Sequence, residues 1–284
     1  MSKPTAPVLR CGAKLLDLSS PVVMGVLNVT PDSFSDGGSF VGQDKALAHA
    51  DAMLESGAAI IDVGGESTRP GAAPVSIQEE LDRVVPVVEV LVQEFQCIVS
   101  VDTSTPEVML AAASVGAGLI NDVRALKRPG ALDAAASLDL PVCLMHMQGQ
   151  PETMQQNPKY QSIERDVADF FAQRIDACVA AGVSKERLML DPGFGFGKTL
   201  EHNVALLSGL SEFMLFGLPL LVGLSRKTMI GAILDKPVDQ RLYGSVAAAV
   251  LAAERGANIV RVHDVSETVD ALKVVAAIRG CSDR

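Results

Sequence analysis

Polar side chains follow several short apolar runs of the sequence, at positions where core residues would otherwise be expected. Asp102 and Asp191 come directly after two such runs, and Asn121 ends a third. A buried carboxylate presents two coplanar acceptors, which match a planar ligand edge with two N–H donors. Asparagine adds one donor and one acceptor. The three residues therefore predict a site for a flat nitrogen heterocycle, although capping of the following helix is an alternative role for either aspartate.

Positively charged side chains also occur where the apolar runs end. Arg261 and His263 are two residues apart at the last apolar run, so we expect their side chains on one side of the strand. Together they can hold a phosphate, and late strand ends are the usual phosphate region of an α/β barrel. A lone arginine there more often forms a solvated ion pair. The other cations of this kind are Arg69, Lys198, Arg226 and Lys227.

Met145 and Phe196 are candidates for the apolar walls that a flat ring needs, although each residue taken singly is more often plain packing. The glycine-rich segment 193–199 resembles two nucleotide-binding motifs and fails both by one residue. A P-loop needs glycine where Pro192 stands, and the dinucleotide fingerprint needs glycine where Lys198 stands. ATPase and NAD-dependent chemistry are therefore not favoured.

The elements that must position these residues alternate regularly along the chain. Eight apolar runs rich in Val, Ile and Leu predict buried parallel strands at 22–29, 59–63, 98–101, 118–121, 141–145, 188–190, 219–224 and 258–262. Helical patterns separate them at 44–56, 77–95, 106–115, 130–138, 162–181, 201–213, 240–255 and 266–278. Eight such units predict an α/β fold, a single (β/α)8 TIM barrel. An open doubly wound sheet is the alternative.

The domain organisation predicted from this pattern is simple. Residues 1–20 form an N-terminal leader, in which 9–19 is expected to be a hairpin that turns at Gly12 and closes the bottom of the barrel. Residues 21–284 form the barrel domain. Because each apolar run ends in a polar or glycine-rich cluster, we place the active site at the C-terminal rim of the strands.

Composition limits the classes of partner. The chain has 284 residues, with 24 Lys plus Arg against 34 Asp plus Glu, and hence a formal charge of −10. Binding of nucleic acid or an anionic membrane through net charge is not expected. No apolar stretch is long enough for a transmembrane helix. The five cysteines are scattered and contain no C-x-x-C pair, which together with the lack of a signal peptide predicts reduced thiols and a cytoplasmic location.

Taken together, these motifs resemble the dihydropteroate synthase family of pterin-binding enzymes, over residues 23–278. The family's signatures stand here as MGVLNVTPDSFSDGG (24–38), GGESTRPG (64–71), SVDT (100–103), IND (120–122), MHMQG (145–149), DPGFGFGK (191–198), GLSRK (223–227) and RVHDV (261–265). The resemblance implies condensation of (7,8-dihydropterin-6-yl)methyl diphosphate with 4-aminobenzoate. The products are 7,8-dihydropteroate and diphosphate, in folate biosynthesis.

The resemblance also implies a role for each site residue. The pterin is expected on Asp102, Asn121, Asp191 and Lys227, with Met145 and Gly223 lining its slot. The diphosphate is expected on Asn28, Thr68, Arg261 and His263, with Mg2+ on Asn28. The 4-aminobenzoate is expected among Phe34, Thr68, Pro70, Phe196 and Ser225. The residues expected to act in catalysis are Asp32, Arg69, Lys227, Arg261 and His263.

The implied partners are these small molecules and a second copy of the chain. For a homodimer, the sequence offers Ala247, Ala248 and Ala252 as a small-residue surface in the helix at 240–255. Two alternatives remain. A pterin-binding methyltransferase that works with a corrinoid partner would not need a diphosphate site, and a non-catalytic paralogue should have lost Asn28, Asp32 or Arg69, which are all present.

Overall fold

A closed ring of parallel strands forms the centre of the molecule. The computed structural model describes residues 8–30, 39–67, 75–150 and 153–282. Its eight-stranded sheet has the order β8-β7-β6-β5-β4-β3-β10-β9. A parallel bridge between Leu190 and Leu220 joins its two edges, so the sheet closes into a barrel. The strands are β3 (Val22–Asn28), β4 (Ile60–Gly64), β5 (Ile98–Asp102), β6 (Leu119–Asp122), β7 (Val142–Met145), β8 (Leu188–Asp191), β9 (Leu221–Val222) and β10 (Ile259–Val262).

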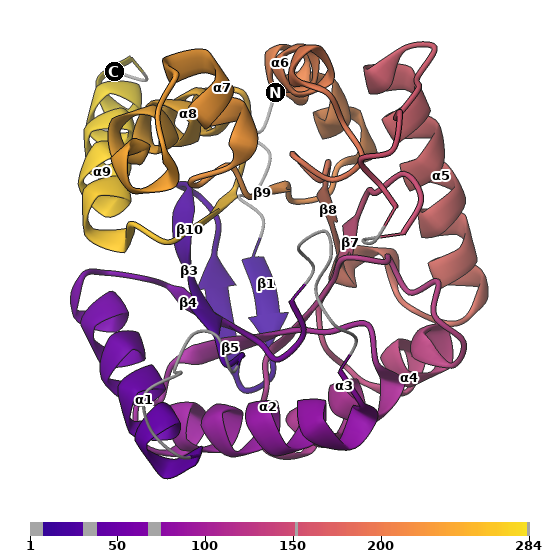
Figure 1. The fold of residues 1–284 in the computed structure, drawn as a ribbon. Helices are drawn as coiled ribbons and strands as arrows, with labels where there is room; N and C mark the ends of the chain where they lie inside the picture. The colour runs from indigo at the N-terminus through magenta and orange to yellow at the C-terminus, as the bar shows by residue number, and fades with distance from the viewer. Residues whose placement is uncertain (1–7, 31–38, 68–74, 151–152, 283–284) are drawn as a thin grey trace.

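Helices surround this barrel as an outer ring (Figure 1). Those of the described residues are α1 (Ser39–Glu55), α2 (Ile77–Gln93), α3 (Pro106–Ser114), α4 (Ala131–Ser137), α5 (Ile163–Ala180), α6 (Leu200–Ser208), α7 (Thr228–Leu234), α8 (Leu242–Glu254) and α9 (Val265–Ser282). Short 3-10 segments lie at Lys185–Arg187, Leu210–Phe216 and Val238–Gln240. The predicted (β/α)8 barrel is confirmed, and the open sheet is excluded.

Burial of both faces of the sheet explains why the strands are almost continuously apolar. All five residues of β4 are buried, and so are all four of β6, β7 and β8. Outward-facing residues such as Ile61, Val101 and Leu144 pack with helix residues into one large apolar cluster. The inward-facing side chains at the C-terminal rim do not belong to this apolar cluster.

The N-terminal hairpin closes the opposite end of the barrel, as predicted. Strand β1 (Val8–Cys11) pairs antiparallel with β2 (Lys14–Asp17), and Gly12 in the turn has φ of +62°. Four hairpin side chains, Leu9, Cys11, Leu16 and Leu18, pack on the first inward residues of the strands: Met24, Ile60, Ile98, Leu119, Cys143, Met189, Leu221 and Ile259. This apolar plug leaves the C-terminal rim as the open end.

Three sequence predictions need correction. Helix α7 is missing from the predicted helices, and the structure adds it between the seventh strand and the helix predicted at 240–255; it is only seven residues long and contains Gly231, which weakens a helical pattern. The helix predicted at 201–213 ends at Ser208 and continues as a 3-10 segment. Ala248 and Ala252 are not a surface of α8, because both are buried in the large cluster with the strands.

Candidate active site

An ion-paired cluster fills the centre of the C-terminal rim. Arg261 on β10 donates from Nε to Asp62 Oδ2 over 2.6 Å and from Nη2 to Asp102 Oδ2 over 2.9 Å. Asn121 on β6 donates from Nδ2 to the same Asp62 oxygen over 3.1 Å. Two residues that the sequence assigned to the heterocycle, Asp102 and Asn121, therefore share a network with Arg261, which it assigned to phosphate.

Asp62 was missed by the sequence interpretation, although it is central to this cluster. It is fully buried in the middle of β4, and its Oδ1 has no hydrogen-bond partner in the described part of the chain. The indication available in the sequence was a single charged residue between Ile61 and Val63, inside an otherwise apolar run. Because buried charges need partners, that position indicated a cation on another strand.

Burial controls the electrostatics of the cluster. Burial raises the pKa of Asp102 to about 7, although Arg261 acts in the opposite direction. Burial alone would lower the pKa of Arg261, but Asp62 and Asp102 outweigh it and raise that pKa. The guanidinium is therefore permanently charged, whereas Asp102 can change protonation near neutral pH.

A second charged pair lies across the rim, on and beside β8. Asp191 is 6% exposed, and its Oδ1 accepts from the backbone N–H of Gly193 over 2.8 Å. Lys227 donates to the carbonyl of Phe194, and its Nζ lies 4.3 Å from the centre of the Phe196 ring. Burial raises the pKa of Asp191 against the effect of Lys227, and burial lowers the pKa of Lys227 to about 8 against the effect of Asp191.

The register of the strands brings several predicted residues to one level of the barrel. Asn28 is paired with Gly64, Gly64 with Asp102, and Asp102 with Asn121. Gly64 leaves room in this layer, because a Cβ built on it would lie 3.8 Å from Asn28 Oδ1 and 3.7 Å from Asp102 Oδ2. The amide oxygen of Asn28 and the Asp102 carboxylate thus face a shared space above a residue without a side chain.

Met145 ends β7 in register with Asp191 and is 3% exposed, so two of the residues expected at the pterin are on neighbouring strands. Gly223 approaches Arg261, since a Cβ on it would lie 3.9 Å from the Arg261 Cβ. His263 lies next to Ser225, with Nδ1 and Oγ 3.0 Å apart. A residue predicted for the diphosphate and one predicted for 4-aminobenzoate are therefore neighbours.

Two neighbouring residues have other roles. The Asp122 carboxylate points away from the cluster: it accepts from the backbone N–H groups of Arg124 and Leu126 at 2.8 and 2.7 Å and from the Ser104 hydroxyl. It therefore shapes the loop after β6. Arg226 is not part of the cluster, because its half-exposed guanidinium pairs with Asp264.

Thr105 precedes α3 as its N-cap, but its hydroxyl makes no capping bond. Instead the hydroxyl donates to the buried Glu80 over 2.7 Å and accepts from Arg128 Nη1 over 2.7 Å. Arg128 is thereby hydrogen-bonded to the residue that precedes α3 at the rim.

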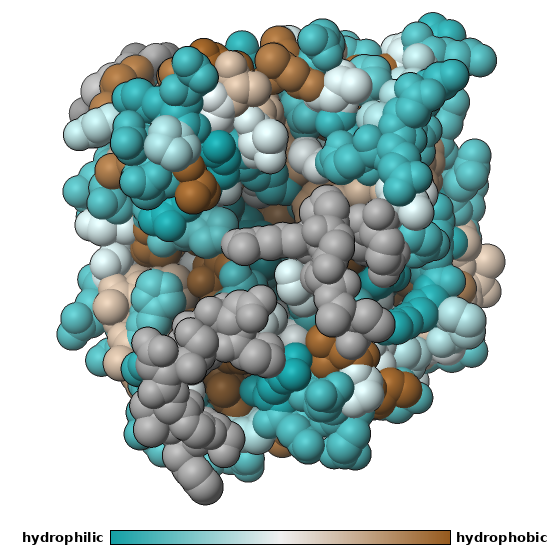
Figure 2. Space-filling view, in the orientation of Figure 1, coloured by the Kyte–Doolittle hydropathy of each residue, from teal (hydrophilic) through white to brown (hydrophobic). Residues whose placement is uncertain are grey.

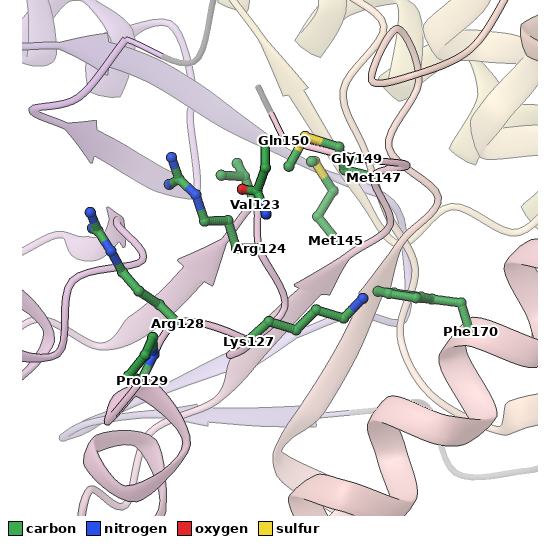
Figure 3. A pocket seen from close by; sticks show the side chains of 10 residues that line it. All are labelled: Val123, Arg124, Lys127, Arg128, Pro129, Met145, Met147, Gly149, Gln150 and Phe170. Atoms are coloured by element: carbon green, nitrogen blue, oxygen red, sulfur yellow. The ribbon is translucent and has the colours of Figure 1, made fainter. Parts of the chain in front are cut away.

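A cavity of about 350 Å3 lies beside this cluster, between the loops that follow β6 and β7. Its lining residues are Val123, Arg124, Lys127, Arg128, Pro129, Met145, Met147, Gly149, Gln150 and Phe170 (Figure 3). The cations already have protein partners: Arg124 forms two 3.1 Å bonds to Glu66, and Lys127 lies over the Phe170 ring at 4.4 Å. Figure 2 shows the hollowed centre of this face bordered by hydrophilic surface.

Some predicted residues lie outside the described part of the chain. These are Asp32, Phe34, Thr68, Arg69 and Pro70. Among the described residues, no group of three or more His, Cys, Asp or Glu side chains could hold a metal ion. No helix of that part is long and apolar enough to cross a membrane.

Comparisons with known proteins agree with this geometry. Residues 24–263 match the family model described as pterin binding enzyme. The dihydropteroate synthase of Escherichia coli K12 is 60% identical over 262 residues, covering 92% of this chain and 93% of that protein. The Yersinia pestis dihydropteroate synthase, solved with a sulfonamide drug, is 60% identical with a TM-score of 0.92, covering 96% of this chain and 99% of its own.

A third relative was solved with a bound pterin compound. The Xanthomonas albilineans dihydropteroate synthase in complex with 7,8-dihydropteroate is 46% identical, with a TM-score of 0.87 and coverage of 96% and 99% of the two chains. The match over nearly the whole barrel, at this level of identity, decides the family. The chain belongs to the dihydropteroate synthase family of pterin-binding enzymes.

Proposed function

We propose that the rim of this barrel joins (7,8-dihydropterin-6-yl)methyl diphosphate to 4-aminobenzoate, giving 7,8-dihydropteroate and diphosphate in folate biosynthesis. The chain is a transferase of this family, and its close relatives are dihydropteroate synthases. The observation that carries the assignment is the pair of carboxylates at the rim, the part-buried Asp102 on β5 and the buried Asp191 on β8, each next to a cation. Such a pair matches a flat ring with N–H donors on its edge.

The pterin is held by Asp102, Asn121, Asp191 and Lys227. Asp191 can offer Oδ2 to the ring, since its Oδ1 accepts from Gly193 N–H. Asn121 has its Nδ2 on Asp62, so its oxygen is the group that faces a donor of the ligand. Met145 and Gly223 line the slot. The apolar face of Met145 and the absence of a side chain at Gly223 leave a gap of the kind a flat ring needs.

The diphosphate is bound at Arg261 and His263, with Thr68 and Asn28 completing the set. Arg261 keeps its charge because two carboxylates surround it, and it can therefore stabilise the negative charge that develops on the leaving oxygen. Asn28 fits a Mg2+ ligand: its amide oxygen faces the open space above Gly64, and Mg2+ in phosphate sites uses few protein ligands beside water and phosphate oxygens. When bound, Mg2+ would neutralise charge on the departing diphosphate.

The 4-aminobenzoate is bound by Phe34, Thr68, Pro70, Phe196 and Ser225, with Asp32 and Arg69 completing the closed site. The Phe196 ring, which Lys227 contacts, offers a flat face for the arylamine. In the reaction, the lone pair of the arylamine nitrogen forms a C–N bond to the methylene carbon. The C–O bond to diphosphate breaks, its electron pair leaves with the diphosphate, and the nitrogen loses one proton to solvent. This substitution needs no covalent nucleophile from the protein.

A coupled assay for diphosphate release tests the function. The purified chain is expected to release diphosphate only when the pterin diphosphate, 4-aminobenzoate and Mg2+ are all present, and to produce 7,8-dihydropteroate in equal amount. Release without 4-aminobenzoate would indicate a pterin diphosphatase. Methyl transfer to a corrinoid protein, without use of the diphosphate ester, would support the methyltransferase alternative instead.

The working form is a homodimer, built on the exposed face of α8. Tyr243, Ala247 and Leu251 recur every fourth residue, and the two larger side chains are 82% and 44% exposed. On α9, which packs beside α8, Val274 and Ile278 are also exposed. Together they form an apolar surface of the kind that mediates self-association. Four cysteines of the described residues are free thiols, which agrees with the expected cytoplasmic location.

A further inference from the structure

Lys198 carries a buried amine for which the reaction above has no use, and burial lowers the pKa of this amine well below its usual value. Its side chain is 4% exposed, and its Nζ lies within reach of four acceptors. It donates to the carbonyls of Gly193 and Phe196 at 2.8 and 3.0 Å, lies 2.9 Å from His146 Nδ1, and is 3.3 Å from the His146 carbonyl. A lysine is almost never this buried unless its amine is paired, as it is here.

These contacts join two rim segments that carry site residues. His146 follows Met145 at the end of β7, while Gly193 and Phe196 belong to the loop after β8. Burial, followed by the charge of Lys198, lowers the pKa of His146 to about 2, so this ring is neutral. Since Nδ1 then acts as the acceptor for Lys198, the ring proton is on Nε2. His146 thus braces Lys198 from one side, and the loop carbonyls hold it from the other.

The braced loop holds the groups that contact Lys227. Lys227 donates to the Phe194 carbonyl, and its Nζ lies 4.3 Å from the Phe196 ring centre. Phe194 and Phe196 lie within the Gly193–Phe196 segment that Lys198 fixes at both ends. A bond to the Phe196 carbonyl determines where that backbone lies, and therefore where the ring is presented.

We propose that Lys198, braced by His146, is a positioning residue for the second substrate: it holds Phe196 where 4-aminobenzoate must stack. The proposal rests on the assignment of Phe196 to 4-aminobenzoate in the proposed function. It differs from a general stabilising role because it predicts unequal effects on the two substrates. Of the pterin groups, Asp102 and Asn121 lie on strands that Lys198 does not contact. Asp191 meets the held loop through the backbone N–H of Gly193, and Lys227 meets it through the Phe194 carbonyl and the Phe196 ring. Pterin binding should therefore change less than binding of 4-aminobenzoate, which meets the Phe196 ring itself.

Steady-state kinetics on Lys198→Met tests the proposal, because methionine keeps the length of the side chain and removes all three donors. We expect the KM for 4-aminobenzoate to rise at least about tenfold, as small displacements of positioning groups allow. The affinity for 6-hydroxymethylpterin, measured by calorimetry, should fall by a clearly smaller factor than the KM for 4-aminobenzoate rises. Tyr160→Phe is the matched control, because it removes a 2.7 Å bond to Gly197 in the same loop and leaves Gly193 and Phe196 untouched. The KM of Tyr160→Phe for 4-aminobenzoate should stay near that of the unaltered chain.

A pair of His146 variants keeps the test open if Lys198→Met does not fold. His146→Asn retains an acceptor near the Nδ1 position and should preserve the KM for 4-aminobenzoate, whereas His146→Leu removes it and should raise that KM. An unchanged KM in both Lys198→Met and His146→Leu would overturn the proposal. So would equal losses for both substrates, or an equal effect of Tyr160→Phe. Failure of the proposed function is distinct, since the unaltered chain would then release no diphosphate.

Discussion

Arg261 Nε and Asp62 Oδ2 lie 2.6 Å apart, and this bond connects β10 to β4 across the inside of the barrel. The same guanidinium reaches Asp102 with Nη2, so one cation serves two carboxylates. Asp62 therefore sets the direction in which Arg261 points, although it belongs to none of the polar sequence motifs that follow the strands. Loss of one partner from such a buried pair leaves a charge uncompensated.

Asp62→Asn should consequently impair turnover while the fold is retained. The amide preserves the shape but removes the charge that orients Arg261, and Asp102 alone then holds the guanidinium. We expect kcat/KM for the pterin diphosphate to fall by about 10- to 100-fold, equivalent to about 1.4–2.7 kcal/mol. Asp264→Asn is the control, because it releases the half-exposed Arg226 at the same rim and should cost less than about threefold. Equal effects of the two substitutions would contradict a special role for Asp62.

The pattern of strands was predictable because burial on both faces forces almost every strand residue to be apolar. The rim was predictable for the opposite reason, since Asp102, Asn121 and Asp191 interrupt that apolarity where the strands end. Asp62 was overlooked because it lies inside a strand, where one polar residue between Ile61 and Val63 is easily read as an exception. Its partner is 199 residues away in the sequence, and only the closed barrel brings the two together.

Roles were harder to predict than positions. The sequence separated a heterocycle group from a phosphate group, whereas the structure bonds Arg261 to Asp102 and places Ser225 against His263. Spacing along one strand indicates which residues share a face, but not which partner on another strand each one meets. For the same reason Lys198 looked like one rim cation among several, although its amine is turned inward onto backbone carbonyls.

Asp191→Asn should damage pterin recognition in particular. Because Gly193 N–H requires an acceptor, the introduced amide will turn its oxygen to that group and its NH2 toward the ligand. The NH2 then faces a donor of the ring edge. We expect the free energy of pterin binding to weaken by about 2–5 kcal/mol, the usual cost of breaking a buried charged hydrogen bond. Calorimetry with 6-hydroxymethylpterin measures this, on protein whose melting temperature is unchanged. Unaltered affinity would remove Asp191 from the pterin site.

Pterin affinity should pass through a maximum between about pH 7 and 8. Burial raises the pKa of Asp102 to about 7, so its carboxylate is lost as the pH falls through that value. Burial lowers the pKa of Lys227 to about 8, so its ammonium is lost as the pH rises through that value. Each limb involves one proton and can reach at most about a tenfold change in affinity per pH unit. The measurement is a series of pterin titrations from pH 5 to 10.

Two variants assign the limbs of that profile. Asp102→Asn cannot ionise and should abolish the acid limb, and Lys227→Met should abolish the alkaline limb, each at a lower overall affinity. A flat profile in the unaltered chain would show that neither group titrates in this range. A profile with both limbs intact in either variant would assign the corresponding proton to another residue.

The apolar stripe on α8 predicts how the chain associates. Tyr243 and Leu251 are 82% and 44% exposed, so an interface there would bury them, and a charge introduced at Tyr243 would remain unpaired. Light scattering should give a mass of twice 29.8 kDa, that of a dimer, for the unaltered chain. For Tyr243→Glu it should give 29.8 kDa, the mass of a monomer. Leu15→Glu is the matched control, because Leu15 is 71% exposed on the hairpin at the closed end of the barrel, and it should leave the dimer intact. A monomeric unaltered chain, or a dimeric Tyr243→Glu variant, would place the interface elsewhere or exclude it. Because Tyr243 is 82% exposed on α8 and is not among the residues assigned to the substrates, the variant also separates association from catalysis. A monomer with full diphosphate release would show that each barrel works alone.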